Sequence, residues 1–310
     1  MLLRHLARRA VGSVFVLLAV SLITFLALDA APGDAAQAMV GESASAEQLA
    51  ELRQALGLDR SPLFRYAQFI GGVALRGDLG RSLVSARPVS TLLAERLPYT
   101  AALALTATGL ALALGALSGI VAAQRAGGPL DLLLMAGATL GLAVPTFWSG
   151  LLLILFFALR LRWLPVAGAE SARHIVLPAL TLAIPTAAIV ARLLRSSLLD
   201  VMSADYVRTA YAKGLSPRQV LIGHVLRNSL IPLVTVVGLH LGHLLGGAFV
   251  VESIFGWPGV GRLAVQAIFD RDTPVVLGAT LTVAALYLAI NLCVDIIHGW
   301  LDPQVAEGAI

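Results

Sequence analysis

Two histidines spaced one helical turn apart are the side chains that could most directly bind a metal ion. They are His240 and His243, and imidazole is a common metal ligand. No third ligand stands near them, so a role in lining a path and a role as neutral buried histidines stay open as alternatives. Helical phase places them on a different face from the glycines of the same segment. We predict no metal site, and we name His240, His243 and Glu252 as path-lining candidates.

Sequence motifs for nucleotide binding and hydrolysis are absent. The chain contains no G-x-x-x-x-G-K-[ST] loop, the motif whose backbone amides cradle phosphates. It also lacks H-E-x-x-H, G-x-S-x-G and paired carboxylates at a membrane boundary, which are typical of hydrolases. We therefore expect a protein that is not an enzyme and that binds no ATP by itself.

A polar stretch at residues 205–232 lies between two apolar segments and carries four basic residues against one acid. Gly214 suits the left-handed position just past a helix end. Ser216 and Gln219 form a capping box, with Pro217 at the first helical position. The pattern predicts a helix, a tight turn and a second helix. Such a shape could be gripped by a soluble partner, or it could be an ordinary positively charged loop.

Composition indicates a membrane protein. Of the 310 residues, 58% are hydrophobic and 13% are charged, whereas soluble domains carry about 25% charged residues. The net charge is +4, but no basic patch is interleaved with aromatic residues, which argues against a nucleic-acid partner. The single cysteine, Cys293, excludes a disulfide within the chain.

Apolar runs predict an all-α, multi-pass protein with six transmembrane helices. The first run is longer than the apolar core of a signal peptide, so we prefer a retained helix to a cleaved leader. A run of about 20 residues crosses a bilayer core. The six runs cover residues 10–28, 99–123, 132–159, 175–191, 230–251 and 275–294.

Basic residues predict the orientation of these helices. Positive charges gather in short cytoplasmic loops, and an N-in, C-in arrangement places ten of them inside and five outside. The inner set is Arg4, Arg8, Arg9, Arg125, Arg192, Arg195, Arg208, Lys213, Arg218 and Arg227, and the outer set is Arg160, Arg162, Arg173, Arg262 and Arg271.

Residues 29–98 then form an extracytoplasmic excursion after the first helix. Ser45 and Gln48 make a capping box, and leucines 49, 52 and 56 recur on one helical face before Gly57 ends the run. We expect this apolar stripe to pack on the protein's own helices.

Small residues four apart predict close helix contacts within the membrane, although packing inside one chain explains them equally well. The sets are Gly115/Gly119, Gly137/Gly141 and Gly238/Gly242/Gly246. Pro145, Pro178 and Pro185 interrupt the apolar runs. Such bends suit a moving pore but also occur in static proteins.

The 205–232 stretch resembles the "EAA" loop of type I ABC-importer permeases, whose pattern is E-A-A-x3-G-x9-I-x-L-P. Gly214 and Ala210 match the glycine and the second alanine, while Arg208 and Thr209 replace the Glu and the first Ala. The variant DYVRTAxAKGLS…LRNxLIP is similar to that of the dipeptide/oligopeptide/nickel subfamily.

Motifs along nearly the whole chain resemble the first, B-type permease of that subfamily. They are APGD at 31–34, LGLD at 56–59, GDLGRS at 77–82, RLPYT at 96–100, VPTF at 144–147, VESIFGWPGVGRL at 251–263 and, with Gln304 as a departure, DPQV at 302–305.

The resemblance implies a type I ABC-importer transmembrane domain at residues 95–299, with a coupling loop at 203–229. An N-terminal transmembrane helix (1–30), an extracytoplasmic segment (31–94) and a cytoplasmic tail (300–310) complete the chain. The loop would seat in a cytoplasmic ATPase. The residues implied in coupling are Asp205, Tyr206, Arg208, Thr209, Ala210, Lys213, Gly214, Leu215, Ser216 and Arg218.

The implied partners are a homologous second permease, ATP-binding subunits that hold ATP and magnesium, an extracytoplasmic solute-binding protein and the lipid of a bacterial inner membrane. The cargo would be a peptide or similar solute, and the sequence does not choose among dipeptides, oligopeptides, nickel chelates, glutathione and oligosaccharides. A stand-alone carrier or channel is the alternative function, and a membrane enzyme comes third.

Overall fold

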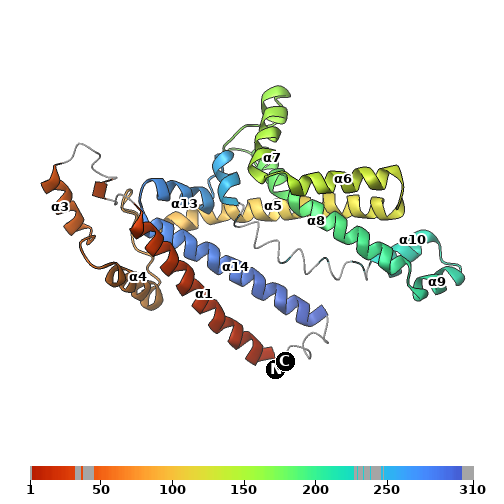
Figure 1. Cartoon of the computed structure of the whole chain (residues 1–310), viewed down its shortest axis with the longest axis horizontal. Coiled ribbons are helices and arrows are strands. Elements are labelled where there is room, and N and C mark those ends of the chain that lie inside the picture. Colours follow the sequence, from red (N-terminus) through yellow and green to blue (C-terminus); the bar gives the residue numbers. More distant parts are fainter. Residues whose placement is uncertain are drawn as a thin grey trace. The chain divides into compact units, whose positions relative to one another are not determined.

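A computed structural model of the chain describes residues 2–31, 36–37, 45–226, 229, 233, 238, 246 and 248–301. Across these residues the secondary structure is helical, apart from an isolated antiparallel bridge between Arg81 and Pro88 (Figure 1). The chain divides into two compact units. Unit 1 comprises Met1–Thr100 and Pro258–Leu288, and unit 2 comprises Ala101–Trp257 and Ala289–Ile310.

Four helices of the described chain are long and apolar enough to cross a membrane. They lie within α1 (Leu2–Ala30), α5 (Val89–Gln124), α8 (Val176–Met202) and α14 (Thr273–Leu301). The bent pair of α6 with α7 and η1 makes a fifth if it counts as one span. A multi-pass membrane protein is therefore confirmed, whereas the number six stays a prediction. The run at 230–251 lies largely outside the described residues.

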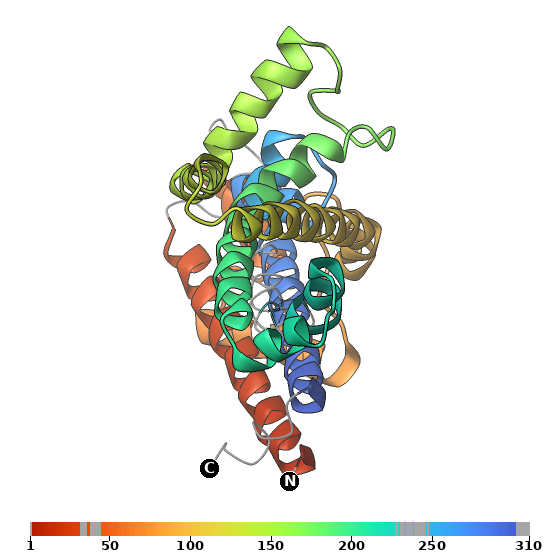
Figure 2. The same ribbon diagram turned by 90° about the vertical axis from the view of Figure 1, so that its right-hand side faces the viewer.

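The third predicted run is a broken helix rather than a straight one. Helix α6 (Pro129–Ala143) ends before Pro145, and α7 (Thr146–Leu153) continues into the π-helix η1 (Ile154–Arg160) at an angle of 109° to α6 (Figure 2). Val144 has extended backbone angles, φ −81° and ψ 125°. A residue before proline is disfavoured in the helical region, and Pro145 has no N–H with which to continue the ladder.

Unit 1 includes α1, α3 (Ala46–Ala55), α4 (Pro62–Arg76) and α13 (Val260–Phe269). The predicted capping box at Ser45 is present, because the Gln48 amide N–H donates to the Ser45 hydroxyl and the Ser45 N–H donates to the Gln48 side chain, both at 3.2 Å. The leucines of α3 are only partly buried. Helix α4, rather than α3, packs against α1.

Unit 2 is organised around α8, whose inward face is buried along most of its length. Helices α6 and α7 pack against it, and Phe255 and Trp257 close a core against its first turns. The predicted glycine contact of α5 is also present. A Cβ on Gly115 would lie 2.6 Å from the Ala187 carbonyl oxygen, and one on Gly119 would lie 2.7 Å from that of Ala191.

The other glycine sets are less uniform. Gly141 faces Ile184, whereas Gly137 has open space beside it. Gly238 lies against Val294 and Gly246 has no close neighbour among the described atoms. Gly242 lies outside the described residues.

Candidate functional site

The predicted helix–turn–helix follows directly after α8. Helix α9 (Asp205–Ala212) begins after Ala204, whose backbone is extended. The chain then reverses at Gly214, with φ +83°, a conformation that an L-residue adopts only at a cost. The Gly214 N–H donates to the Tyr211 carbonyl at 2.9 Å. The left-handed position inferred for Gly214 from the sequence is therefore correct.

A second short helix, α10 (Pro217–Val220), starts at Ser216 and continues into the π-helix η2 (Leu221–Leu226). The Ser216 N–H donates to Oε1 of Gln219 at 2.9 Å, and the Ser216 hydroxyl donates to the same oxygen at 2.8 Å. Half of the predicted capping box is therefore formed, because Gln219 reaches back to the N-cap amide. We call residues 205–226 the coupling element, after the role that the family resemblance implies for them.

One face of the coupling element is buried against neighbouring helices of unit 2. Val207 and Ala210 of α9 join Val220 and Val225 in an apolar cluster with Ala123 of α5 and with Leu194 and Leu198 of α8. Leu215 of the turn packs partly against this cluster. Ala210 and Leu215 were among the predicted coupling residues. In the structure they pack the coupling element against α5 and α8 of the same chain.

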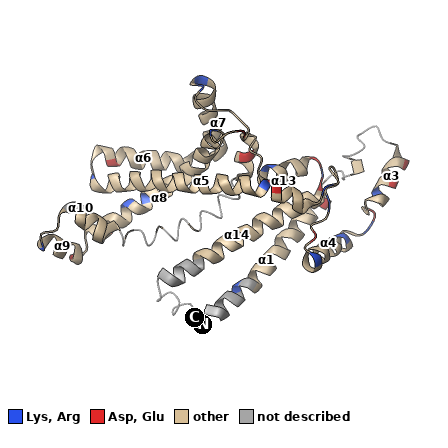
Figure 3. Cartoon of the chain, turned by 180° about the vertical axis from the view of Figure 1, so that it is seen from behind, with Lys and Arg blue, Asp and Glu red and all other residues tan. Residues whose placement is uncertain are grey.

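The opposite face is exposed and polar, and Figure 3 shows basic residues on α9 and at the adjoining end of α8. An ion pair between Arg208 and Asp205, at 3.8 Å, joins two side chains that are 77% and 99% exposed, so it contributes little to stability. The exposed residues are Asp205, Tyr206, Arg208, Thr209, Lys213, Gly214 and Ser216. Arg218 is the second residue of α10.

Two exposed side chains of the coupling element were not among the predicted site residues. Tyr211 and Ile222 are both large and open to solvent. Tyr211 lies one helical turn after Arg208, so the helical phase of α9 predicts its exposure. An aromatic ring beside basic residues is a common feature of protein interfaces.

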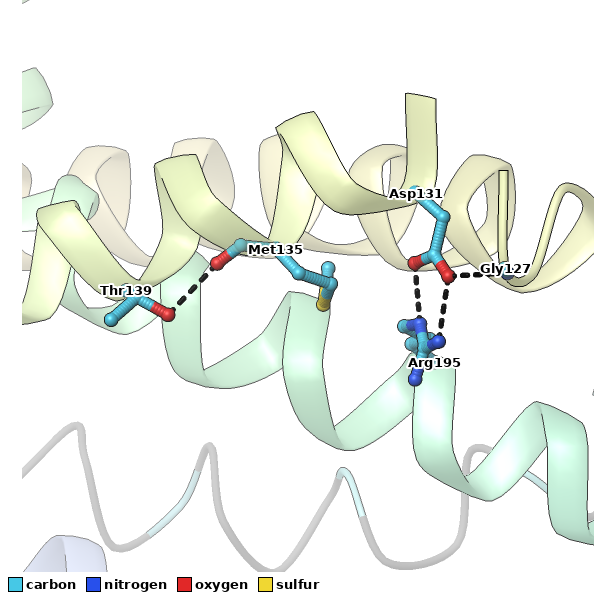
Figure 4. Close-up of polar contacts among 5 residues, drawn as sticks. All are labelled: Gly127, Asp131, Met135, Thr139 and Arg195. Carbon is cyan, nitrogen blue, oxygen red and sulfur yellow. Dashed lines mark hydrogen bonds and ion pairs between the residues drawn. The ribbon is translucent and has the colours of Figure 1, made fainter. Parts of the chain in front are cut away.

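A partly buried ion pair joins α6 to α8 (Figure 4), with Asp131 buried and the Arg195 side chain 28% exposed. The guanidinium of Arg195 donates to both carboxylate oxygens of Asp131, with Nε to Oδ1 at 2.6 Å and Nη2 to Oδ2 at 2.7 Å. The N–H of Gly127 also donates to Oδ2, at 2.9 Å. Asp131 lies in the first turn of α6, where a negative charge suits the helix dipole.

This pair fastens the turn between α5 and α6 to α8, one residue from Leu194 of the cluster beneath the coupling element. A planar guanidinium that holds a carboxylate with two parallel bonds fixes orientation as well as distance. From the sequence, Arg195 was counted among the inner positive charges and no partner was predicted for it. Its acidic partner could have been noticed as the one acid following the Gly-Gly-Pro turn at 127–129.

The path-lining candidates lie elsewhere. His240 and His243 are outside the described residues. Glu252 is fully buried, and its carbonyl accepts a hydrogen bond from the Trp257 N–H at 2.8 Å. In this structure Glu252 therefore lies within the packed part of unit 2 and not on an open surface.

Family models match almost the whole chain. The model described as "Binding-protein-dependent transport system inner membrane component" matches residues 111–307, and the corresponding N-terminal model matches residues 2–104. Glutathione transport system permease protein GsiC of Escherichia coli K12 is 41% identical over 98% of this chain and 99% of its own length. The GsiC protein of Salmonella paratyphi A gives the same values.

Solved structures show the same fold at lower identity. A structure of the MetNI methionine ABC transporter, in inward-facing conformations, has a TM-score of 0.56 and 19% identity over 69% of this chain and 97% of its own. An amino acid ABC transporter has a TM-score of 0.51 and 17% identity over 67% and 94%. The chain belongs to the family of binding-protein-dependent transport system inner membrane components, the non-catalytic permease subunits of ABC importers.

Proposed function

We propose that this chain forms half of the translocation path of an ATP-driven importer in a bacterial inner membrane. A homologous second permease supplies the other half, and an extracytoplasmic binding protein delivers the solute. Cytoplasmic subunits bind ATP and magnesium and hydrolyse the nucleotide. The observation that carries this proposal is the coupling element, which has a buried apolar face and an exposed polar face on a single rigid turn.

The coupling element acts as the contact through which the ATPases move the permease. Its exposed face, with Arg208, Tyr211 and Lys213, seats in a cleft of one ATPase subunit. Its buried face shares an apolar cluster with α5 and α8, so a force applied to α9 passes to both helices through close-packed side chains, which deform little. The Asp131–Arg195 pair extends this rigid region to α6.

The solute belongs to the short peptides, with glutathione as the first candidate. Support comes from the glutathione permeases that are 41% identical across 98% of the chain. A peptide-like solute offers charged termini, and selectivity for it rests largely with the binding protein. We therefore propose a direct screen, in which the purified cognate binding protein is titrated with glutathione, dipeptides and nickel chelates.

Substitution of Gly214 by glutamate tests the coupling role. A glutamate there strains the left-handed turn, at about 1–3 kcal/mol, and brings a bulky anion to the exposed face. We expect the assembled importer to insert normally, to lose most of its solute uptake, and to lose stimulation of ATP hydrolysis by loaded binding protein. Uptake into vesicles and phosphate release measure these effects.

Gly57 provides the matched control. It is also left-handed, with φ +66°, and has no atom within 4 Å of its would-be Cβ. Gly57→Glu carries the same backbone strain away from the coupling element, so uptake should persist. Normal uptake and normal coupling in Gly214→Glu would contradict the proposal. Uptake that continues after deletion of the ATPase genes would instead support a stand-alone carrier.

A further inference from the structure

Helix α4 is attached to the middle of a transmembrane helix as well as to its end. The Tyr66 hydroxyl donates to the Leu18 carbonyl at 3.0 Å and lies 2.9 Å from the Ser21 hydroxyl. Its ring also packs on Phe25, with 5.6 Å between ring centroids. All three partners lie inside the apolar span Val11–Ala30 of α1.

These contacts set the depth of α4. Leu18 lies 12 residues before Ala30, the end of the span, which corresponds to about 18 Å along a helix axis. A tyrosine side chain is far shorter than that, so the backbone at Tyr66 lies within the thickness that the span crosses. Arg65 reaches the opposite way and binds Asp29 at 2.8 Å, which places its charge at the end of the span, as a snorkelling side chain does.

The other face of α4 is apolar and open. Leu63, Phe64 and Leu75 are 69%, 52% and 86% exposed, and at 100° per residue they fall on one side of the helix together with Ala67 and Ala74. Exposed clusters of large apolar side chains mark a surface that binds something apolar. Gln68 is the only amide or charged side chain between Arg65 and Arg76.

Lipid is the occupant that fits this face. The adjoining span of α1 is itself open along its length, with Phe15 and Ile23 exposed and 11% of the span buried. Near Tyr66, whose depth the contacts with α1 set, the free face of α4 continues that lipid-facing surface. A helix satisfies its own backbone hydrogen bonds and can therefore lie in hydrocarbon, and Arg60, whose guanidinium lies over the Phe64 ring, suits the headgroup region.

We propose that α4 is an interfacial helix embedded in the bilayer, with Leu63, Phe64 and Leu75 against the acyl chains of the leaflet around the C-terminal half of α1. With the N-terminus in the cytoplasm, this is the outer leaflet. The excursion after the first helix is then partly a membrane structure, and α3 projects from it into water. The coupling role of residues 205–226 has no part in this inference.

Spin labels placed at single cysteines test the depth. The sole native cysteine is removed by Cys293→Ser, and a nitroxide is then attached in separate variants at Phe64→Cys, at Leu75→Cys and, as the water-exposed control on α3, at Glu51→Cys. The full importer is reconstituted in phosphatidylethanolamine and phosphatidylglycerol vesicles, and solute uptake verifies that each labelled variant is folded. Collision rates with oxygen and with a water-soluble nickel chelate are measured by power saturation.

Oxygen partitions into hydrocarbon and the nickel chelate into water, so the logarithm of their collision ratio should be positive at positions 64 and 75 and negative at 51. A negative value at 64 and 75 would place the face in water and overturn the proposal. Low collision rates with both reagents, together with an immobilised nitroxide, would show that protein covers the face and would overturn it equally. Two labelled positions are used so that misfolding of one variant leaves the other informative.

Discussion

Asp131 in unit 2 and Asp272 in unit 1 are two buried carboxylates, and each holds a loop to a helix. They differ in the donors from which they accept hydrogen bonds. Asp131 accepts two hydrogen bonds from the Arg195 guanidinium and one from the Gly127 N–H. Asp272 accepts from the Ser82 hydroxyl at 2.5 Å and from the Leu83 N–H at 3.1 Å.

The difference lies in the charge of the donors. Around Asp131 a full positive charge depends on the carboxylate, so loss of the carboxylate leaves a partly buried guanidinium without its counter-charge. Ser82 and Leu83 are neutral donors, and loss of the negative charge at Asp272 still leaves one of them an oxygen to bind. The two contacts should therefore respond differently to the same substitution.

Asp131→Asn should have the largest effect. It keeps the shape but removes the charge that compensates Arg195, so a partly exposed guanidinium loses its counter-charge and the free energy of unfolding falls. The free energy of unfolding in mixed micelles, titrated with dodecyl sulfate and followed by circular dichroism, measures the loss. The double variant Asp131→Leu/Arg195→Leu should recover part of it, because no buried charge is left. A double variant less stable than Asp131→Asn would count against the charge argument.

Arg195→Lys should have an intermediate effect, smaller than that of Asp131→Asn, because an ammonium keeps the charge but cannot hold both carboxylate oxygens in one plane. Arg192→Lys is the control, since Arg192 lies one turn earlier on the exposed face of α8 and should tolerate the change. The same unfolding titration applies. Equal losses of unfolding free energy in Arg192→Lys and Arg195→Lys would mean that the bidentate hydrogen bonding of Arg195 to Asp131 does not contribute to stability.

Asp272→Asn should have the smallest effect, about 1 kcal/mol, which is typical of a weakened hydrogen bond. The amide oxygen still accepts from one of the two donors, while its NH₂ group faces the other. Ser82→Ala, which removes the hydroxyl donor, should cost a similar amount. A loss at Asp272→Asn as large as that at Asp131→Asn would erase the distinction between the two carboxylates.

Local signals along the chain predicted the helix–turn–helix geometry of residues 205–226 well. The turn at Gly214 and the hydrogen bonds between Ser216 and Gln219 each involve residues within about four positions of one another. Their geometry can therefore be predicted without knowledge of the rest of the fold. Which side chains of α9 face outward was harder to predict. Ala210, a predicted coupling residue, is buried, whereas Tyr211, which was not predicted, is exposed. Which side of a short amphipathic helix packs depends on the positions of α5 and α8 beside it. The sequence predicted apolar runs for both helices but not where they lie relative to α9.

Long-range features were missed for a related reason. Asp131 and Arg195 are 64 residues apart, and no local pattern links them. Pro145 was visible as an interruption of an apolar run, but the 109° angle between the helices depends on what packs against each half. Likewise the contact of Tyr66 with Leu18 could not be foreseen, because the apolar pattern of α4 does not say which helix it meets.

The separation of Asp131 and Arg195 also has a consequence for biosynthesis. Asp131 leaves the ribosome 64 residues ahead of its partner, and at about 5–20 residues per second the delay is roughly 3–13 s. During that interval the carboxylate has only local donors, of which the Gly127 amide is four residues away. The turn at 127–131 is therefore able to close first and to hold the acid until α8 emerges, so the order of synthesis matches the order in which these bonds can form.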